Sequence, residues 1–233
     1  MQHKGNRVSG SDRRRQILTV AAELFARQGF RGTTTRQIAE RAGINEAILF
    51  HHFRRKEDLY WAILDDKCRG RGGRERLEAE LRAPGDDREV FAAIAEGILR
   101  RNTEDNTLSR LLLFSALEHH RLSHRFFRTH VAQYYEALAL HIRERIRAGI
   151  FRRVDPLLAA RGFLGMIVYH FLIQELFGGR RYQKFDTRRV CRTLAEIWLE
   201  GMRARRRHLR SAPRMQRQSD VRARRASTIG KEG

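Results

Sequence analysis

Hydrogen-bonding side chains stand at helix-terminal positions in the stretch TTTRQIAERAGINEAILFHHFRRK. Thr34 has a glutamine three residues later, the capping-box spacing, and is expected to begin a helix. Gly43 ends that helix, because glycine tolerates the left-handed conformation of a helix end, and Asn45 caps a second helix over residues 46–52. The hydroxyls of Thr34 and Thr35 can bind phosphate, although a purely structural cap explains Thr34 equally well. Two short helices joined by such a turn can set a helix N-terminus into the major groove of DNA.

A preceding helix must brace this pair. It is expected to begin at Ser11 or Asp12, to carry an apolar face at helical spacing, and to end at Gly29. In the second helix of the pair, Leu49 and Phe53 are four residues apart and should both point into the core. The sequence therefore predicts a three-helix unit with a helix-turn-helix on its outer side.

Stop and start signals divide the rest of the chain into further helices. We expect a break at residues 70–73, where three glycines occur, and a boundary at Pro84-Gly85 followed by a cap at Asp86 or Asp87. Asp155 with a following proline, and Asp186, should each begin a later helix. The last four of these helices are predicted over residues 105–119, 122–146, 157–178 and 186–203, and the first of the four is expected to be largely buried.

Catalytic motifs are missing from the sequence. It has no GxSxG, P-loop, GxGxxG or HExxH pattern, so we expect no enzyme and no cofactor. His120 and His124 have the spacing of a metal-binding pair, but no carboxylate or thiol constellation accompanies them. We therefore interpret the two histidines as polar residues at the surface or in the lining of a pocket, and we expect no metal site. Cys68 and Cys191 show no CxxC spacing, which indicates neither a disulfide framework nor a cysteine zinc site.

The charge indicates a polyanionic partner. The 233 residues carry a formal net charge of +21, which favours nucleic acid first and an anionic membrane surface second. No uninterrupted apolar run approaches the roughly 20 residues that span a bilayer, and the N-terminus lacks the apolar core of a signal peptide. We therefore expect a cytoplasmic protein without a membrane partner.

Composition also predicts the domain organisation. Residues 1–10 are expected to form a flexible arm, residues 11–56 the helix-turn-helix domain, and residues 57–203 a larger helical domain. From residue 203 onward the chain has eleven cations and two carboxylates, so we expect residues 204–233 to form a basic disordered tail. The helices 157–178 and 186–203 are expected to form a dimer interface, with burial inside one chain as the alternative.

A resemblance to a known family rests on residues that run without a gap from about Ile17 to Leu64. In order they are Phe25, Gly29, Phe30, Thr33, Thr34, Ile38, Ala39, Ala42, Gly43, Leu49, Phe50, His52, Phe53, Lys56 and Leu59. This pattern is similar to the N-terminal domain of the TetR family of transcriptional regulators. The resemblance implies an all-α homodimer of about nine helices per chain. Three N-terminal helices would bind DNA, and a larger C-terminal helical domain would dimerise and hold a small molecule.

The resemblance also implies roles for single residues. Arg36 stands where the family has a base-reading arginine, with a phosphate contact as the alternative. The positions that would face bases are Asn45, Glu46, Ala47 and His51, and those that would face the DNA backbone are Phe50, His52 and Lys56. Phe50 and Ile48 replace a tyrosine and a threonine that are frequent in the family, so two hydroxyls for phosphate are missing. For His52, half-buried packing is an equal alternative.

These features predict a DNA-binding regulator, in the first place a repressor that binds a palindromic operator as a homodimer and is released by an unknown small-molecule effector. The alternative is a non-specific, architectural nucleic-acid-binding protein without a ligand switch. Candidate effector contacts interleave aromatic and polar groups on apolar helices, although such stripes are commonly simple core. They are Phe114, Leu117, His120, Tyr134, Tyr135, Tyr169, His170 and Gln174.

Overall fold

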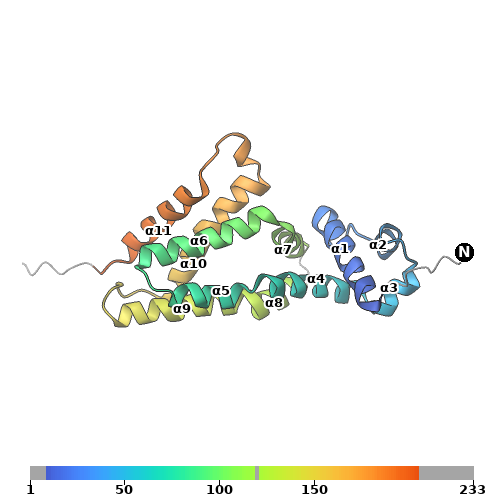
Figure 1. Cartoon of the computed structure of the whole chain (residues 1–233), viewed down its shortest axis with the longest axis horizontal. Coiled ribbons are helices and arrows are strands. Elements are labelled where there is room, and N and C mark those ends of the chain that lie inside the picture. Colours follow the sequence, from blue (N-terminus) through green and yellow to red (C-terminus); the bar gives the residue numbers. More distant parts are fainter. Residues whose placement is uncertain (1–8, 119–120, 205–233) are drawn as a thin grey trace, which may run out of the picture.

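Helices form the architecture of the chain in a computed structural model, which describes residues 9–118 and 121–204 (Figure 1). Within those ranges the only other regular pairing is an isolated antiparallel bridge between Phe151 and Arg203. The all-α prediction is therefore confirmed. The predicted arm and tail lie outside the described residues, except for residues 9, 10 and 204.

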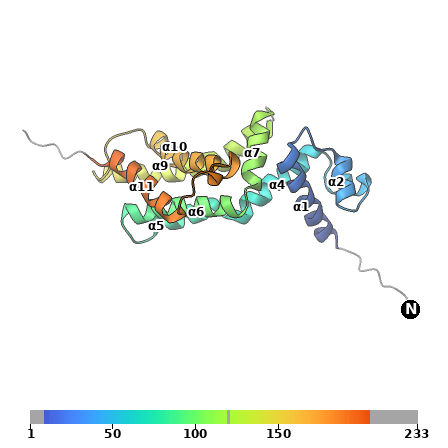
Figure 2. The ribbon, with the colours of Figure 1, turned by 90° about the horizontal axis from the view of Figure 1, so that it is seen from above.

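Three helices form the N-terminal end. They are α1 (Gly10–Gln28), α2 (Thr35–Arg41) and α3 (Glu46–His52), and α1 lies between the other two and the rest of the molecule (Figures 1 and 2). The fully buried Ile17, Phe25, Ile38 and Leu49 hold them together. The prediction of a braced helix-turn-helix is confirmed.

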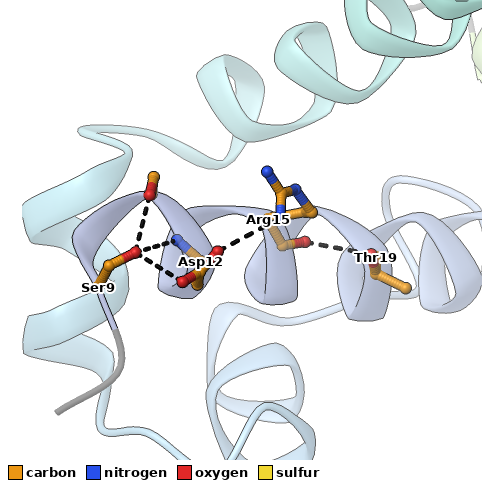
Figure 3. A network of polar contacts seen from close by, with 5 residues as sticks. Ser9, Asp12, Arg15 and Thr19 are labelled. Carbon is orange, nitrogen blue, oxygen red and sulfur yellow. Dashed lines mark hydrogen bonds and ion pairs between the residues drawn. The ribbon is translucent and has the colours of Figure 1, made fainter.

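The start of α1 differs from the expectation. Ser9, and not Ser11 or Asp12, is the N-cap, and its hydroxyl oxygen lies 3.1 Å from the Asp12 backbone nitrogen that donates to it. The same hydroxyl lies 2.7 Å from the Asp12 carboxylate, so both polar groups of Asp12 bind Ser9 (Figure 3). Asp12 therefore serves the first turn of the helix rather than its cap.

The long helix α4 (Lys56–Arg71) leads away from this end and is followed by α5 (Gly73–Arg82). Gly72 separates them with φ of 49°, a left-handed conformation that glycine adopts without strain. The predicted break at residues 70–73 is thus confirmed.

The remaining helices surround a second hydrophobic cluster. They are α6 (Asp87–Glu104), α7 (Thr107–Leu117), α8 (Arg121–Phe126), α9 (Ala132–Arg147), α10 (Pro156–Phe171) and α11 (Thr187–Met202). Asp86, Asp155 and Asp186 accept hydrogen bonds from the first turns of α6, α10 and α11, as predicted. Phe91 and Trp198 stack with their ring centroids 4.5 Å apart at the centre of this cluster.

Two irregular turns were not anticipated. The predicted helix 122–146 is divided by a π-helical turn, η1 (Phe127–Val131), and α10 continues into another, η2 (Leu172–Leu176), before a 3-10 turn, η3 (Gly179–Arg181). The prediction that helix 105–119 is largely buried is wrong, because Leu113 is exposed and 75% of Leu117 is accessible. Helix α7 covers the core with one face only.

One helix is long and apolar enough to cross a membrane by length and composition alone. It runs from Pro156 to Leu176, and 28% of its most apolar window is buried. Arg161 and Glu175 interrupt it, which is why no continuous apolar run of this length is visible in the sequence. Core helices of water-soluble domains have the same length and apolar composition. These two properties therefore indicate only that the apolar surface of the helix must be covered.

Candidate DNA interface and effector cavity

Helix α3 is held in place by a capping hydrogen bond at its N-terminus and by two buried side chains. Asn45 Oδ1 lies 2.8 Å from the backbone nitrogen of Ile48, which donates to it, while Leu49 and Phe53 are buried beneath the helix. The opposite side of α3 is open to solvent at Ala47, Ile48, Phe50 and His51, and His52 is half-buried. The helix thus presents a mixed polar and apolar face on a fixed base.

The N-terminus of α2 lies against that of α3. Thr34 forms the predicted capping box with Gln37, with a distance of 3.1 Å from the Gln37 nitrogen to the threonine oxygen. Thr35 donates to the carboxylate of Glu46 over 2.6 Å, which joins the first turns of the two helices. Thr35 and Glu46 therefore bind each other in the free protein, and any contact of either with DNA must share or replace that bond.

Arg36 projects from the first turn of α2. Its guanidinium forms a 2.9 Å ion pair with Glu40 one turn later, and both side chains are largely exposed. Exposed pairs of this kind contribute about 0–1 kcal/mol, so Arg36 can leave Glu40 for another anion at little cost.

Lys56 holds the loop between α1 and α2. Its ammonium donates to the backbone oxygens of Phe30 at 2.8 Å and Thr33 at 2.9 Å, and lies 4.2 Å from the centre of the Phe30 ring. Burial lowers the pKa of this ammonium. Two of its three N–H bonds are thus engaged within the protein.

Arginines at the start of α1 make intramolecular contacts as well. Arg15 forms an exposed 3.3 Å ion pair with Asp12, visible in Figure 3, and the Arg14 guanidinium lies 4.9 Å from the centre of the Phe53 ring. The cationic groups remain at the surface beside α3, where they add positive potential to its exposed face.

A cavity of about 740 Å³ lies between α4, α5, α6, α7, α9 and α10. Leu108, Leu112, Leu164 and Val168 give it apolar walls, and Tyr134 and Tyr135 add aromatic ones. The polar lining includes Asp65, Arg69, Arg74, Arg101, Asn102 and His130. A volume of this size, with apolar and aromatic walls and polar groups among them, is typical of small-molecule sites.

His130 is the least satisfied polar group of this lining. Its buried Nε2 atom has no hydrogen-bond partner and lies 3.7 Å from the Asp65 carboxylate, beyond hydrogen-bonding distance. Burial lowers the pKa of the imidazole, which favours its neutral form. His130 belongs to the π-helical turn η1, a type of turn that is frequent at functional sites.

The sequence identified only part of this cavity. Tyr134 and Tyr135 line it, whereas Phe114, Leu117, Tyr169, His170 and Gln174 lie outside its lining, and His120 lies outside the described residues. Tyr169 is 66% exposed, and Gln174 is buried elsewhere. His130 was missed because the π-helical turn η1 sets the direction in which it faces.

Helices α4 and α7 connect the cavity to the helix-turn-helix. The hydroxyl of Tyr60 in α4 donates to the Leu111 backbone oxygen in α7 over 2.6 Å, and the Arg110 guanidinium of α7 donates to the Ala26 oxygen of α1 over 2.7 Å. At the end of α7, the Glu118 carboxylate accepts from the backbone nitrogens of Phe30 at 3.2 Å and Arg31 at 3.3 Å. Arg110 and Glu118 therefore join α7 to α1 and the α1–α2 loop, while Tyr60 joins α4 to α7.

Gly29 makes this close approach possible. Its φ is 76°, and a Cβ atom at this position would lie 2.3 Å from a Glu118 carboxylate oxygen and 3.0 Å from the Phe114 ring. Both backbone conformation and space thus require glycine where α7 meets the loop.

Comparisons with known proteins agree with this arrangement. Residues 17–63 match the family described as bacterial regulatory proteins, tetR family, and residues 89–200 match the C-terminal domain of AefR-like transcriptional repressors. The chain therefore belongs to the TetR family of transcriptional regulators, a family of DNA-binding helix-turn-helix proteins.

Individual relatives are similar over parts of the chain. The transcriptional activator FasR of Mycolicibacterium smegmatis is 31% identical over 113 residues, which cover 47% of this chain and 49% of FasR. The repressor KstR2 of Rhodococcus jostii is 50% identical over 54 residues, which cover 23% of this chain and 26% of KstR2. The chain thus spans about half or less of the length of these curated relatives.

A solved structure supports the fold over most of the chain. The regulator FadR from Bacillus subtilis, in complex with stearoyl-CoA, has a TM-score of 0.64 with 21% identity. The match covers 80% of this chain and 98% of FadR. At this identity the likeness shows the shared fold alone.

Proposed function

We propose that this protein is a cytoplasmic transcriptional repressor that binds a palindromic operator as a homodimer and releases it when a small molecule occupies the α4–α7 cavity. The observation that carries the proposal is that α4 and α7 each line the cavity and each hold the helix-turn-helix. Asp65 and Cys68 of α4 and Leu108 of α7 line it. The Tyr60 ring of α4 packs against the Phe25 and Phe30 rings of the DNA-binding end, and Glu118 at the end of α7 binds the Phe30 nitrogen. A ligand that shifts either helix therefore shifts the helix-turn-helix.

In the proposed complex, α3 lies in the major groove. Asn45, Ala47 and His51 face base edges, with Ala47 against a thymine methyl, and Glu46 accepts from a cytosine amino group after releasing Thr35. Arg36 leaves Glu40 and binds guanine. The residues proposed to contact the sugar-phosphate backbone are Thr34, Thr35, Phe50, His52 and Lys56, of which Lys56 has one N–H bond left for a phosphate.

The proposed dimer pairs α10 and α11 of two protomers. Leu158 is 64% and Ile197 57% exposed on these helices, and both border an apolar groove between them. Apolar surface gains about 25 cal/mol per Å² when it leaves water, which favours covering such a face. A two-fold dimer would place two copies of α3 in successive major grooves, about 34 Å apart.

The cavity chemistry favours an amphipathic anion as the effector. Apolar walls at Leu112 and Val168 can hold a hydrocarbon chain, while Arg69, Arg74 and Arg101 supply positive charge at the same site. Asp65 and Glu78 pair with two of these arginines at the surface, so an anionic ligand would exchange one carboxylate partner for another. Because the related FadR structure holds stearoyl-CoA, acyl-CoA thioesters are the first compounds to test.

Filling the cavity tests the effector site. Leu112→Trp places a large ring in the lining, whereas Leu113→Trp adds the same ring on the exposed side of the same helix. Fluorescence anisotropy should show that short-, medium- or long-chain acyl-CoA releases a selected duplex from the wild type and from Leu113→Trp, but not from Leu112→Trp. Release from Leu112→Trp at the wild-type concentration would place the effector elsewhere.

Removing the contact between Glu118 and the α1–α2 loop tests whether the effector cavity is coupled to the helix-turn-helix. Glu118→Ala removes the acceptor of the Phe30 and Arg31 N–H groups, and Glu104→Ala removes an exposed carboxylate from the end of α6. We expect Glu118→Ala to bind the effector normally but to lose most of the effector-dependent change in DNA affinity. Glu104→Ala should behave as wild type. Full release from Glu118→Ala would show that the signal takes another route.

A further inference from the structure

A second cationic site lies at the other end of the molecule. A hollow of about 1240 Å³ is formed by the end of α9, the α9–α10 connector and the end of α11. Figures 1 and 2 show these segments at the opposite end of the long axis from α3. The lining contains Arg147, Arg152, Arg153 and Arg203, and Glu200 is its only carboxylate.

These arginines differ from those that pair with a carboxylate along their own helix. Arg36, Arg69, Arg74 and Arg82 each pair with a carboxylate four residues away along a helix. For the four arginines of the hollow, no ion pair is formed among the residues that the structure describes. All four are exposed, so their guanidinium groups are accessible to a partner.

The backbone holds the site in place. Phe151 is buried in the second hydrophobic cluster, where its ring centroid lies 5.8 Å from that of Trp198. On either side, the Arg152 nitrogen donates to the Met202 oxygen at 2.8 Å, and the Ala204 nitrogen donates to the Ile150 oxygen at 3.2 Å. The connector and the end of α11 are therefore fastened together, and their arginines stay side by side.

The sequence that follows the hollow is strongly basic. Ala204 lies in its lining, and the 29 residues that follow in the sequence contain ten lysines and arginines against two carboxylates. Positive charge thus continues from the site, which favours an extended polyanion over a single small one. Guanidinium groups bind phosphate oxygens with two parallel N–H bonds, so a phosphodiester backbone fits this set.

We propose that this hollow, which we call the distal arginine site, binds the phosphate backbone of a second DNA duplex while the helix-turn-helix holds the first. The protein would then bridge two DNA segments. Duplex DNA is favoured over an anionic membrane because Arg153 and Arg203 line a hollow rather than a flat apolar face, and because the first partner is DNA. This activity does not depend on an effector or on operator sequence.

A bridging assay with the full-length chain tests the proposal. One random-sequence duplex is immobilised, and capture of a second, fluorescent duplex is measured over a range of salt concentrations. The variant Arg147→Gln/Arg153→Gln/Arg203→Gln removes three guanidinium groups that make no side-chain hydrogen bond or ion pair within the described part of the chain. Arg128→Gln/Arg181→Gln/Arg192→Gln is the matched control, since it removes the same charge from exposed positions outside the hollow.

We expect the distal variant to capture at least about tenfold less second duplex, and the slope of log affinity against log salt for capture to fall by about three. The control should capture as the wild type does, and both variants should bind a single duplex alike, because distant sites act independently. Equal capture by the two variants, or no capture by the wild type, would overturn the proposal. So would loss of binding to phosphatidylserine-rich vesicles by the distal variant with unchanged capture of DNA.

Discussion

Replacing Lys56 separates two roles that one cation can play beside DNA. In the free protein its ammonium donates to two carbonyl oxygens of the α1–α2 loop and lies over the Phe30 ring. Lys56→Gln shortens the side chain and removes the charge, so both bonds and the ring contact are lost. If the residue chiefly holds this loop, the variant loses stability; if it chiefly contacts phosphate, the variant loses salt-dependent affinity.

The structure gives the size of the effect. A hydrogen bond from a charged donor contributes about 1.5–3 kcal/mol, and a cation over an aromatic ring about 0.5–1 kcal/mol at an accessible site. Both carbonyls are only partly buried, so water replaces part of what is lost, and we expect a total of about 2–3 kcal/mol. In a chain of this size that lowers the Tm by about 5–10 °C.

Thermal unfolding and DNA binding of the same preparations decide between the roles. Arg54→Gln is the control, because it removes a neighbouring exposed charge. We expect Lys56→Gln to unfold at lower temperature than Arg54→Gln at equal protein concentration, and to lower the salt slope by about one through loss of its phosphate contact. A wild-type Tm together with a slope reduced by about one would refute the structural role.

Three further substitutions have defined outcomes. Arg36→Ala should leave the Tm unchanged and reduce discrimination at one guanine by about 1–3 kcal/mol in competition binding, and an equal loss on every sequence would make it a phosphate contact. Gly29→Ala should destabilise the fold by at least about 1 kcal/mol in urea unfolding, because φ is 76° and Glu118 occupies the space of the new methyl group; an unchanged midpoint would contradict this. Asp105 has a pKa of about 2, since its bonds to Lys67 and the Thr107 nitrogen outweigh the opposing effect of burial. This pKa lies below the unfolded value, so the stabilisation is present above about pH 4 and is lost as the pH falls through 2. Asp105→Asn should therefore cost about 1 kcal/mol at pH 7 after allowance for solvent screening, and nothing near pH 2, and an equal loss at both would contradict the assignment.

Helix ends could be predicted because capping is a local interaction. Asn45, Asp86, Asp155 and Asp186 each satisfy backbone N–H groups two or three residues away, so the sequence contains both partners. The predicted start of α1 was wrong because Ser9, Ser11 and Asp12 can all cap a helix and lie within four residues. The N-cap is the residue whose side chain accepts from the Asp12 nitrogen, which is Ser9.

The cavity could be predicted only in part because distant segments build it. Tyr134 and Tyr135 follow the helical periodicity of the sequence, but the π-helical turn η1 just before them changes the facing of Thr129 and His130. Nothing in the local sequence indicates that turn. The bonds of Lys56 to the α1–α2 loop likewise join residues more than twenty positions apart.

The central claim is that the free protein binds a particular DNA sequence and that its charge of +21 alone does not determine binding. The most direct measurement selects duplexes with the purified protein from a random pool and compares the best one with a scrambled duplex at low and physiological salt. We expect a palindromic site and a preference of about a hundredfold or more that persists at physiological salt. Equal, steeply salt-dependent binding to both duplexes would contradict the account and favour a non-specific architectural protein.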